Sequence, residues 1–247
     1  MRRLPAGDRT GENVFEDLRA HAARVYSEGG EDGAIARLFE RIGVGGRHFV
    51  EFGAWDGVHL SNTANLRLHA GWRGLLMEGN PPRTRAGVRS EFVTAENIDA
   101  LLRRYGVPEG FDLLSIDIDG NDYWVWKALR ACRPRVVVIE YNIHFAPDDA
   151  CTIAYRPDHV WDRSHYHGAS LAALAALGRE KGYALVYADA WSPNAFFVAD
   201  EVLPRGVRVR PVSEVTPWKG LRRVPDRLGR PWVEVGRRRE GAGYIGK

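Results

Sequence analysis

The chain has 247 residues, of which 45% are hydrophobic and 27% are charged, and its formal net charge is +3. This length and composition can bury a sizeable core and are typical of a single globular domain rather than a disordered or fibrous protein. No apolar run approaches the roughly 20 residues that span a bilayer, and the polar segment 7–12 argues against a signal peptide, so we expect a cytoplasmic protein without a membrane partner.

The cysteine content argues against a disulfide-rich protein, and the distribution of charges gives no sign of a nucleic-acid-binding protein. Cys132 and Cys151 form no CxxC pair, so we expect ordinary buried thiols rather than a disulfide framework. Acidic and basic residues are mixed along most of the chain rather than grouped into blocks, and we expect no nucleic-acid partner. The basic cluster from Arg222 to Arg239 is expected to be a solvated face, and the sequence carries no signal for an oligomeric state.

Short apolar segments alternate with amphipathic ones, which predicts a largely parallel sheet with helices on both faces. We expect strands at 48–54, 74–78, 92–94, 113–117 and 136–141, and helices at 32–42, 62–70, 98–105, 123–131 and 170–181. Ser170 is expected to cap the last helix and Gly182 to end it.

The pattern changes after Gly182, where two apolar segments, 184–190 and 195–199, are separated by only four residues. So short a link predicts antiparallel pairing and therefore a reversed last strand. The segment between Tyr141 and Ser170 is long and irregular, which is typical of a functional loop. We expect a core domain at 26–210, flanked by an N-terminal extension at 1–25 and a C-terminal extension at 211–247.

The most informative segment is 49–57, an apolar strand that runs into an acidic, glycine-bearing turn. Gly53 and Gly57 permit backbone conformations that other residues avoid, so a ligand can approach closely. Glu51 and Asp56 place negative charge where a phosphate would be repelled. This polarity favours a cofactor with a positive charge and a ribose, and S-adenosylmethionine is the common one.

The stretch 26–142 resembles FkbM-like, class I S-adenosylmethionine-dependent methyltransferases. Five blocks carry the resemblance in the family's order: 30–33, 50–57, 75–80, 113–120 and 136–142. The resemblance implies a Rossmann-like α/β sheet, mostly parallel with an antiparallel last strand, and S-adenosylmethionine as cofactor. Methyl transfer in natural-product biosynthesis is the activity that we expect from it.

The cofactor residues implied by the resemblance lie at strand ends. Those expected to hold the methionine portion are Glu51, Gly53, Asp56, Gly57, Asn62 and Thr63, and Ala54 and Asp117 are further cofactor-binding candidates. Glu78, at the end of the second strand, is expected to accept hydrogen bonds from the ribose hydroxyls, because an ionised carboxylate is an acceptor only. Asn97 and Ile98 are expected near the adenine, although helix capping explains Asn97 equally well.

A nicotinamide-dependent oxidoreductase is the leading competitor on a similar fold. If Gly53 served as the first glycine of GxGxxG, Trp55 and Val58 would replace the second and third. Both side chains would crowd a pyrophosphate, and Asp56 would repel it. The sequence therefore disfavours a dinucleotide site.

Polar groups also follow the fourth and fifth strands. Asp117, Glu140 and Asn142 are candidate oxygen ligands for Mg²⁺, with the alternative that the carboxylates act by charge and hydrogen bonding alone. The catalytic candidates are His144 as the base, Asp117 and Glu140. Aromatic residues in and after the long loop are candidate walls for an acceptor: Tyr155, Trp161, Tyr166 and Trp191.

Together these features predict methyl transfer to a hydroxyl oxygen of a small-molecule acceptor, such as a metabolite or sugar. Nitrogen and carboxylate acceptors remain open. Two alternatives are a metal-assisted, hydroxylase-like relative and a non-catalytic module that only binds the cofactor.

Overall fold

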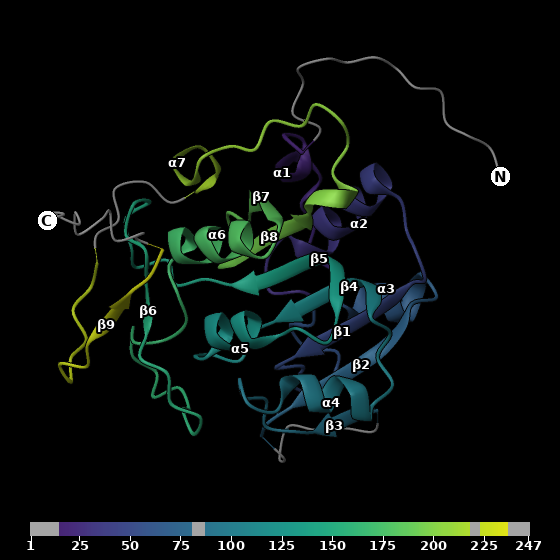
Figure 1. The fold of residues 1–247 in the computed structure, drawn as a ribbon. Helices are drawn as coiled ribbons and strands as arrows, with labels where there is room; N and C mark the ends of the chain where they lie inside the picture. Colours follow the sequence, from purple (N-terminus) through teal and green to yellow (C-terminus); the bar gives the residue numbers. More distant parts are fainter. Residues whose placement is uncertain (1–14, 81–86, 218–222, 237–247) are drawn as a thin grey trace, which may run out of the picture.

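A seven-stranded sheet forms the centre of the computed structural model, which describes residues 15–80, 87–217 and 223–236 (Figure 1). The strands are β1 His48–Phe52, β2 Arg73–Glu78, β3 Val88–Ser90, β4 Gly110–Ile116, β5 Arg133–Glu140, β7 Tyr183–Ala188 and β8 Asn194–Ala199. Their spatial order is β3-β2-β1-β4-β5-β8-β7, and β8 is antiparallel to both of its neighbours while the other pairs are parallel. The predicted Rossmann-like sheet with a reversed last strand is confirmed.

Helices cover both faces of this sheet. Two separate buried clusters show the division: one contains residues of α1 Leu18–His21, α2 Glu31–Ile42 and α3 Ala64–His69, and the other residues of α4 Ile98–Arg104, α5 Asp122–Ala128 and α6 Leu171–Glu180. Within β5, Val136 faces the first cluster and Val137 the second. Because side chains alternate across a strand and both faces are covered, the central strands are mostly apolar.

Most expected elements are confirmed to within a few residues. The expected cap and stop of α6, Ser170 and Gly182, are confirmed as well. The Ser170 hydroxyl accepts a hydrogen bond from the Ala173 N–H at 3.1 Å, and Gly182 follows the helix with a φ of 75°. The expected strand at 92–94 is wrong, since the third strand lies at Val88–Ser90. The Asn97 side chain bonds the Thr94 N–H and the Phe92 carbonyl instead, and such local side-chain bonds compete with a strand ladder.

The long loop after β5 is tied to the C-terminal extension by a small second sheet. Its strands, β6 Cys151–Ile153 and β9 Trp232–Glu234, pair antiparallel and lie beyond the carboxyl ends of β4 and β5 in Figure 1. Trp232 packs against Phe145 and Tyr166, with ring centroids 4.7 Å away in each case. The described part of this extension therefore supports the loop. Arg222 and the run at 237–239 of the expected basic cluster lie outside the described residues.

The described part of the N-terminal extension is also packed. Phe15 and Leu18 are buried against α2, among Ile35, Leu38 and Phe39.

Short helical segments at Asp200–Val202 and α7 Val212–Val215 follow β8. Cys151 is buried and Cys132 is half-buried, and the two form no disulfide among the described residues.

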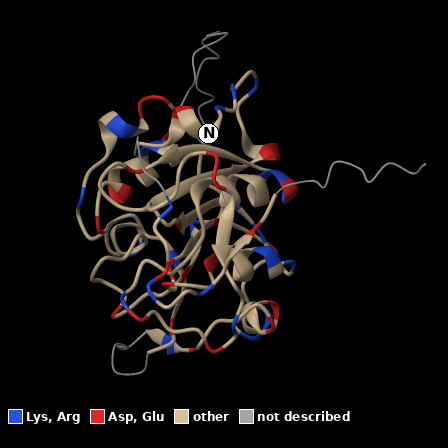
Figure 2. Ribbon diagram, turned by 90° about the vertical axis from the view of Figure 1, so that its left-hand side faces the viewer, with Lys and Arg blue, Asp and Glu red and all other residues tan. Residues whose placement is uncertain are grey.

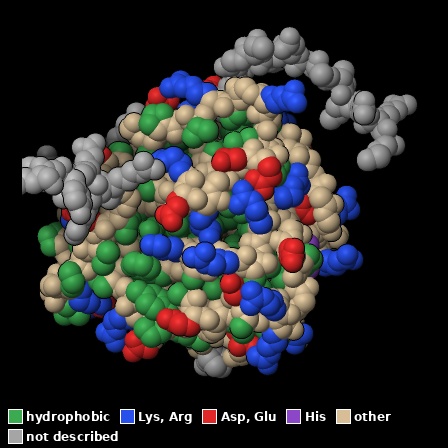
Figure 3. Space-filling model, in the orientation of Figure 1, with side chains coloured by type: hydrophobic (Ala, Val, Ile, Leu, Met, Phe, Trp, Pro, Cys, Tyr) green, Lys and Arg blue, Asp and Glu red, His purple; other side chains and the backbone are tan. Residues whose placement is uncertain are grey.

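Surface composition agrees with the mixed charge order of the sequence. On the face drawn in Figure 3, basic and acidic side chains are interspersed rather than separated into blocks. None of the helices in the described ranges combines the length and the apolar character that a bilayer crossing requires.

Candidate active site

A cavity of about 690 Å³ lies at the carboxyl ends of β1, β2, β4 and β5. Open α/β sheets bind their ligands at this edge. Figure 2 views the molecule from this side, with acidic segments near the middle of the view. Four of the expected site residues line the cavity, namely Gly53, Glu78, Asp117 and Glu140.

Backbone conformation marks the same place. The described residues include five non-glycine residues with positive φ, and four of them line this cavity: Trp55, Leu60, Asp119 and Arg163. Such conformations cost free energy and concentrate at functional sites. The clustering therefore supports the assignment of the cavity independently of its chemistry.

Gly53 is required by the close approach of two strand ends. Its φ is 71°, and a Cβ atom at this position would lie 1.5 Å from the carbonyl oxygen of Asp117. No other residue type fits without moving one of the two backbones. Ala54, which donates from its N–H to the Met77 carbonyl at 3.0 Å, holds the loop to β2 but does not line the cavity.

Glu51, Asn62 and Thr63 lie behind the cavity wall. The Glu51 carboxylate accepts hydrogen bonds from the Asn62 N–H at 2.9 Å and the Thr63 hydroxyl at 2.5 Å, and burial raises its pKa. The Asn62 amide donates to the Ser115 hydroxyl at 3.1 Å. These three residues hold the start of α3 against β1 and β4, so any influence on a cofactor is exerted through that framework.

Glu78 faces the cavity with a carboxylate whose orientation is set by the backbone. Oε2 accepts from the Trp55 N–H at 3.0 Å, and Oε1 accepts from the Asn80 N–H at 2.7 Å. Each oxygen retains acceptor capacity for a ligand. Asn97 and Ile98 do not line the cavity, because Asn97 braces the preceding turn and Ile98 is fully buried in the core. Phe92 and Val93 line this side instead.

Three carboxylates, which we call the acidic trio, converge between β4 and β5. Asp117, Asp122 and Glu140 each offer an oxygen within 4.8 Å of the others. Burial, followed by the charge of Glu140, raises the pKa of Asp117 well above its usual range. Burial, followed by the charge of Asp122, does the same for Glu140. Mutual repulsion in a desolvated site thus favours a bound proton or cation.

The acidic trio fits a hard cation such as Mg²⁺, which prefers carboxylate oxygens. Oε2 of Glu140 is buried and has no hydrogen-bond partner among the described residues, and Nδ1 of His167 lies 3.7 Å away. Asn142, the third ligand expected from the sequence, is engaged elsewhere. Its amide donates to the carbonyls of His165 and His167 and accepts from the His144 N–H. Asp122 takes its place in the geometry.

His144 does not line the cavity. Its ring lies against His165 with centroids 4.0 Å apart, and burial, with the charges of His165 and His167, lowers its pKa. Its assignment as the base remains a prediction without support from this geometry. The histidines that do line the cavity are His59 and His159, and the His159 ring lies over Gly120, where a Cβ atom would be 2.2 Å from its Cδ2.

Sequence reasoning missed several lining residues. Glu28 precedes α2, and His159 and Arg163 lie in the long loop, whose length was the only signal for them. Of the four aromatic candidates only Trp161 lines the cavity.

The acidic pair at 31–32 also has a role that the sequence did not reveal. Glu31 is fully buried and accepts hydrogen bonds from the Gly29 N–H, the Ser192 hydroxyl and the Asn194 amide. This pairing fastens the segment that carries Glu28 to the turn between β7 and β8.

Asp56 belongs to a second, smaller recess beside the cavity, whereas Gly57 lines neither space. Gly57 has a φ of 77°, and Oδ1 of Asp56 accepts from the N–H groups of Val58 and His59 at 2.9 and 2.8 Å. Asp56 lines this recess rather than the large cavity. His59 and Leu60 line both.

Comparison with known proteins gives a family match. The family model described as the methyltransferase FkbM domain matches residues 51–200, which is more than half of the chain. No curated protein sequence matches this chain.

Three solved structures show distant similarity. The MycE methyltransferase from the mycinamycin biosynthetic pathway, in complex with Mg, SAH and mycinamycin VI, is 18% identical with a TM-score of 0.36, over 66% of this chain and 47% of that one. The CMeT domain of the citrinin polyketide synthase is 10% identical with a TM-score of 0.36, over 68% and 51%. TnmH is 18% identical with a TM-score of 0.35, over 68% and 57%. The chain thus spans about half the length of the structures that it matches.

Proposed function

Because the chain belongs to the methyltransferase FkbM domain family, we propose that it transfers a methyl group from S-adenosylmethionine to a hydroxyl oxygen of a small metabolite or sugar. One observation carries the proposal. Glu78, a carboxylate oriented to accept hydrogen bonds, lines the same cavity as Asp117 and Glu140, two members of the acidic trio at the neighbouring strand ends. S-adenosylmethionine supplies an electrophilic methyl group on a sulfonium centre.

The cofactor half of the cavity suits an adenosyl sulfonium in three respects. Glu78 offers acceptor oxygens to ribose hydroxyls, and Gly53 lets the backbone of the loop approach a ligand. Phe92 and Trp55 present partly exposed aromatic surface at the wall, suited to a planar ring. The excess of carboxylates in the wall favours a cationic ligand over a phosphate.

The acceptor half is suited to removing a proton from a hydroxyl group. Asp117 and Glu140 have raised pKa values, and a base whose pKa lies closer to neutrality accepts a proton more effectively. The acidic trio would also hold Mg²⁺, whose charge would favour the ionised hydroxyl when the ion is bound. His159, Trp161 and Arg163 form the outer wall, where they would contact the acceptor.

The proposal is tested by cofactor binding and by methyl transfer. Calorimetry with S-adenosylhomocysteine should give saturable binding, and methyl-labelled S-adenosylmethionine should label an acceptor from a panel of sugars and phenols. Absence of cofactor binding would overturn the proposal. Binding without transfer to any acceptor, with or without Mg²⁺, would identify a non-catalytic cofactor-binding module.

A further inference from the structure

The charges of the large cavity leave one part of the proposed cofactor without a partner. Its described wall holds a single arginine, Arg163, in the acceptor-side loop. The same wall holds six carboxylates, namely Glu28, Glu78, Glu91, Asp117, Asp119 and Glu140. S-adenosylmethionine carries a sulfonium and an ammonium group, which this wall attracts, but also an α-carboxylate, which it repels. The carboxylate therefore requires a cation outside the large cavity.

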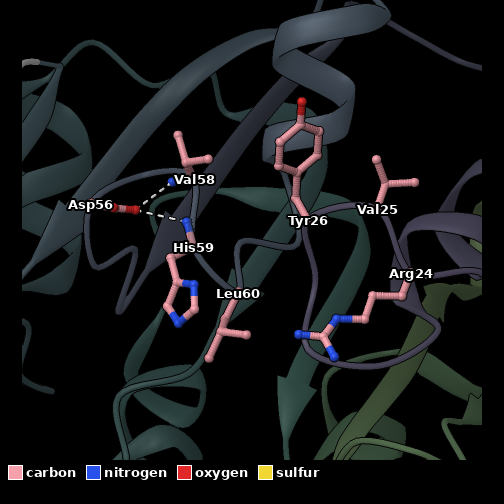
Figure 4. Close-up of a pocket in the computed structure, with 7 residues that line it drawn as sticks. All are labelled: Arg24, Val25, Tyr26, Asp56, Val58, His59 and Leu60. Carbon is pink, nitrogen blue, oxygen red and sulfur yellow. Dashed lines mark hydrogen bonds between the residues drawn. The ribbon is translucent and has the colours of Figure 1, made fainter.

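The smaller recess supplies such a cation. It has a volume of about 270 Å³ and is formed by residues 24–26 on one side and by the loop after β1 on the other. In Figure 4 the guanidinium of Arg24 and the ring of His59 extend to the same side, with Leu60 between them. Since His59 and Leu60 also line the large cavity, the two spaces adjoin.

The backbone around the recess is held in place by buried contacts. Oδ2 of Asp32, a residue only 3% exposed, accepts hydrogen bonds from the N–H groups of Val25, Tyr26 and Ser27 at 2.8, 2.7 and 2.8 Å. Ser27 in turn forms a parallel bridge with Leu60. The recess is thus preformed, so that a ligand there would pay little ordering cost.

The charge of Arg24 is available for a ligand. The side chain is exposed and makes no hydrogen bond or salt bridge with any residue that the structure describes. The charge of Arg24 also acts on Glu28, which lines the large cavity. Desolvation and the charge of Glu31 raise the pKa of Glu28, whereas the charge of Arg24 lowers it. Asp56 adds one negative charge to the recess, but its Oδ1 is bound by two backbone N–H groups.

We propose that the recess is the α-carboxylate subsite of the cofactor, in which Arg24 binds the carboxylate of S-adenosylmethionine while Glu28 faces its ammonium group. This inference rests on the proposed function. Arg24 is then a binding residue that reads the amino-acid end of the cofactor, and guanidinium–carboxylate pairing provides the recognition.

The test combines Arg24 variants with truncated ligands in calorimetry. Arg24→Gln should weaken binding of S-adenosylhomocysteine roughly 10- to 100-fold, the range for a hydrogen bond between charged groups. Binding of 5′-methylthioadenosine, which lacks the amino-acid end, should stay within about twofold of wild type. Decarboxylated S-adenosylmethionine should be equally insensitive to the variant, because it keeps the amine and lacks only the carboxylate. Arg24→Lys should retain part of the affinity, and the exposed Arg179→Gln serves as control.

The outcomes separate the two proposals. If Arg24→Gln binds S-adenosylhomocysteine as wild type does, the subsite is overturned and the proposed function stands. If Arg24→Gln weakens all three ligands equally, the residue acts on the whole site and the subsite is also overturned. If the wild-type protein binds none of them, the proposed function fails together with the subsite. Thermal denaturation of each variant shows whether it is folded.

Discussion

Oε2 of Glu78, at the end of β2, accepts a hydrogen bond from the backbone N–H of Trp55, in the loop after β1, at 3.0 Å. The contact joins the acid expected to bind ribose to the loop expected to bind the methionine portion. Because the Asn80 N–H holds the other oxygen at 2.7 Å, the carboxylate is oriented before a ligand arrives. Replacement of Glu78 therefore has consequences both for the ligand and for the loop.

Glu78→Gln should weaken binding of S-adenosylhomocysteine by about 1–3 kcal/mol, the value for a lost hydrogen bond to a charged group. The glutamine retains one acceptor oxygen for the loop, which makes it a cleaner change than Glu78→Ala. Calorimetry measures the affinity, and the exposed Glu180→Gln on α6 is the matched control. Equal affinities for Glu78→Gln and wild type would remove the ribose role.

The sequence predicted the strands whose ends form the site, because β1, β2, β4 and β5 pack against helices on both faces and are therefore mostly apolar. The edge strand β3 was misplaced, since Val88–Ser90 is short and largely exposed and carries no apolar pattern. The apolar residues Phe92 and Val93, which suggested a strand at 92–94, line the cavity instead.

Site residues beyond the strand ends were harder to predict. Asp122 lies five residues after Asp117, so the sequence places it near the end of the fourth strand, but only the structure shows that it, rather than Asn142, completes the acidic trio. His159 reaches the wall because Gly120 leaves room for its ring, a contact between residues far apart in sequence. The pairing of β6 with β9 is likewise a long-range contact with no local pattern.

The acidic trio gives a prediction about metal. Mg²⁺ should raise the melting temperature of the metal-free wild-type protein, because a cation relieves repulsion among Asp117, Asp122 and Glu140. At a concentration about one hundred times Kd the gain in unfolding free energy is about 2.7 kcal/mol. Asp122→Asn should abolish most of this gain, whereas the exposed Asp200→Asn should keep it. An identical melting temperature for the wild-type protein with Mg²⁺ and with EDTA would contradict metal binding.

The His144–His165 contact gives a pH dependence of stability. Burial and the neighbouring histidines lower the pKa of His144 below its usual value of 6.5, so just below that pH the unfolded chain binds more protons than the native one. Stability should therefore fall as the pH drops below about 6.5. His144→Phe, which keeps an aromatic ring beside His165, should lose less stability than wild type between about pH 7.5 and 5.5 in thermal denaturation. The same change at exposed His21 should leave the dependence of stability on pH as in wild type. If His144→Phe also showed the wild-type dependence, His144 would not be its cause.

Arg230 connects the C-terminal extension to the loop that forms the proposed acceptor wall. Its guanidinium lies 3.0 Å from an Asp162 oxygen and 2.8 Å from an Asp226 oxygen, donates to the Ser164 hydroxyl at 3.0 Å, and lies 4.2 Å from the ring centroid of Tyr166. Asp162 sits between the wall residues Trp161 and Arg163. Arg230 is therefore a positioning residue for that wall.

Arg230→Ala should loosen the loop at 158–166 without changing the cofactor half of the cavity. We expect amide hydrogen exchange in this loop to become about tenfold faster or more, because hydrogen bonds between charged groups contribute about 1.5–3 kcal/mol each. Affinity for S-adenosylhomocysteine should be unchanged, and KM for any acceptor should rise more than kcat falls. Arg208→Ala, which removes an exposed ion pair with Glu214, is the control. Unchanged exchange at 158–166 in Arg230→Ala would show that β6 and β9 hold the loop alone, whereas loss of cofactor affinity would show that the two halves of the cavity are not independent.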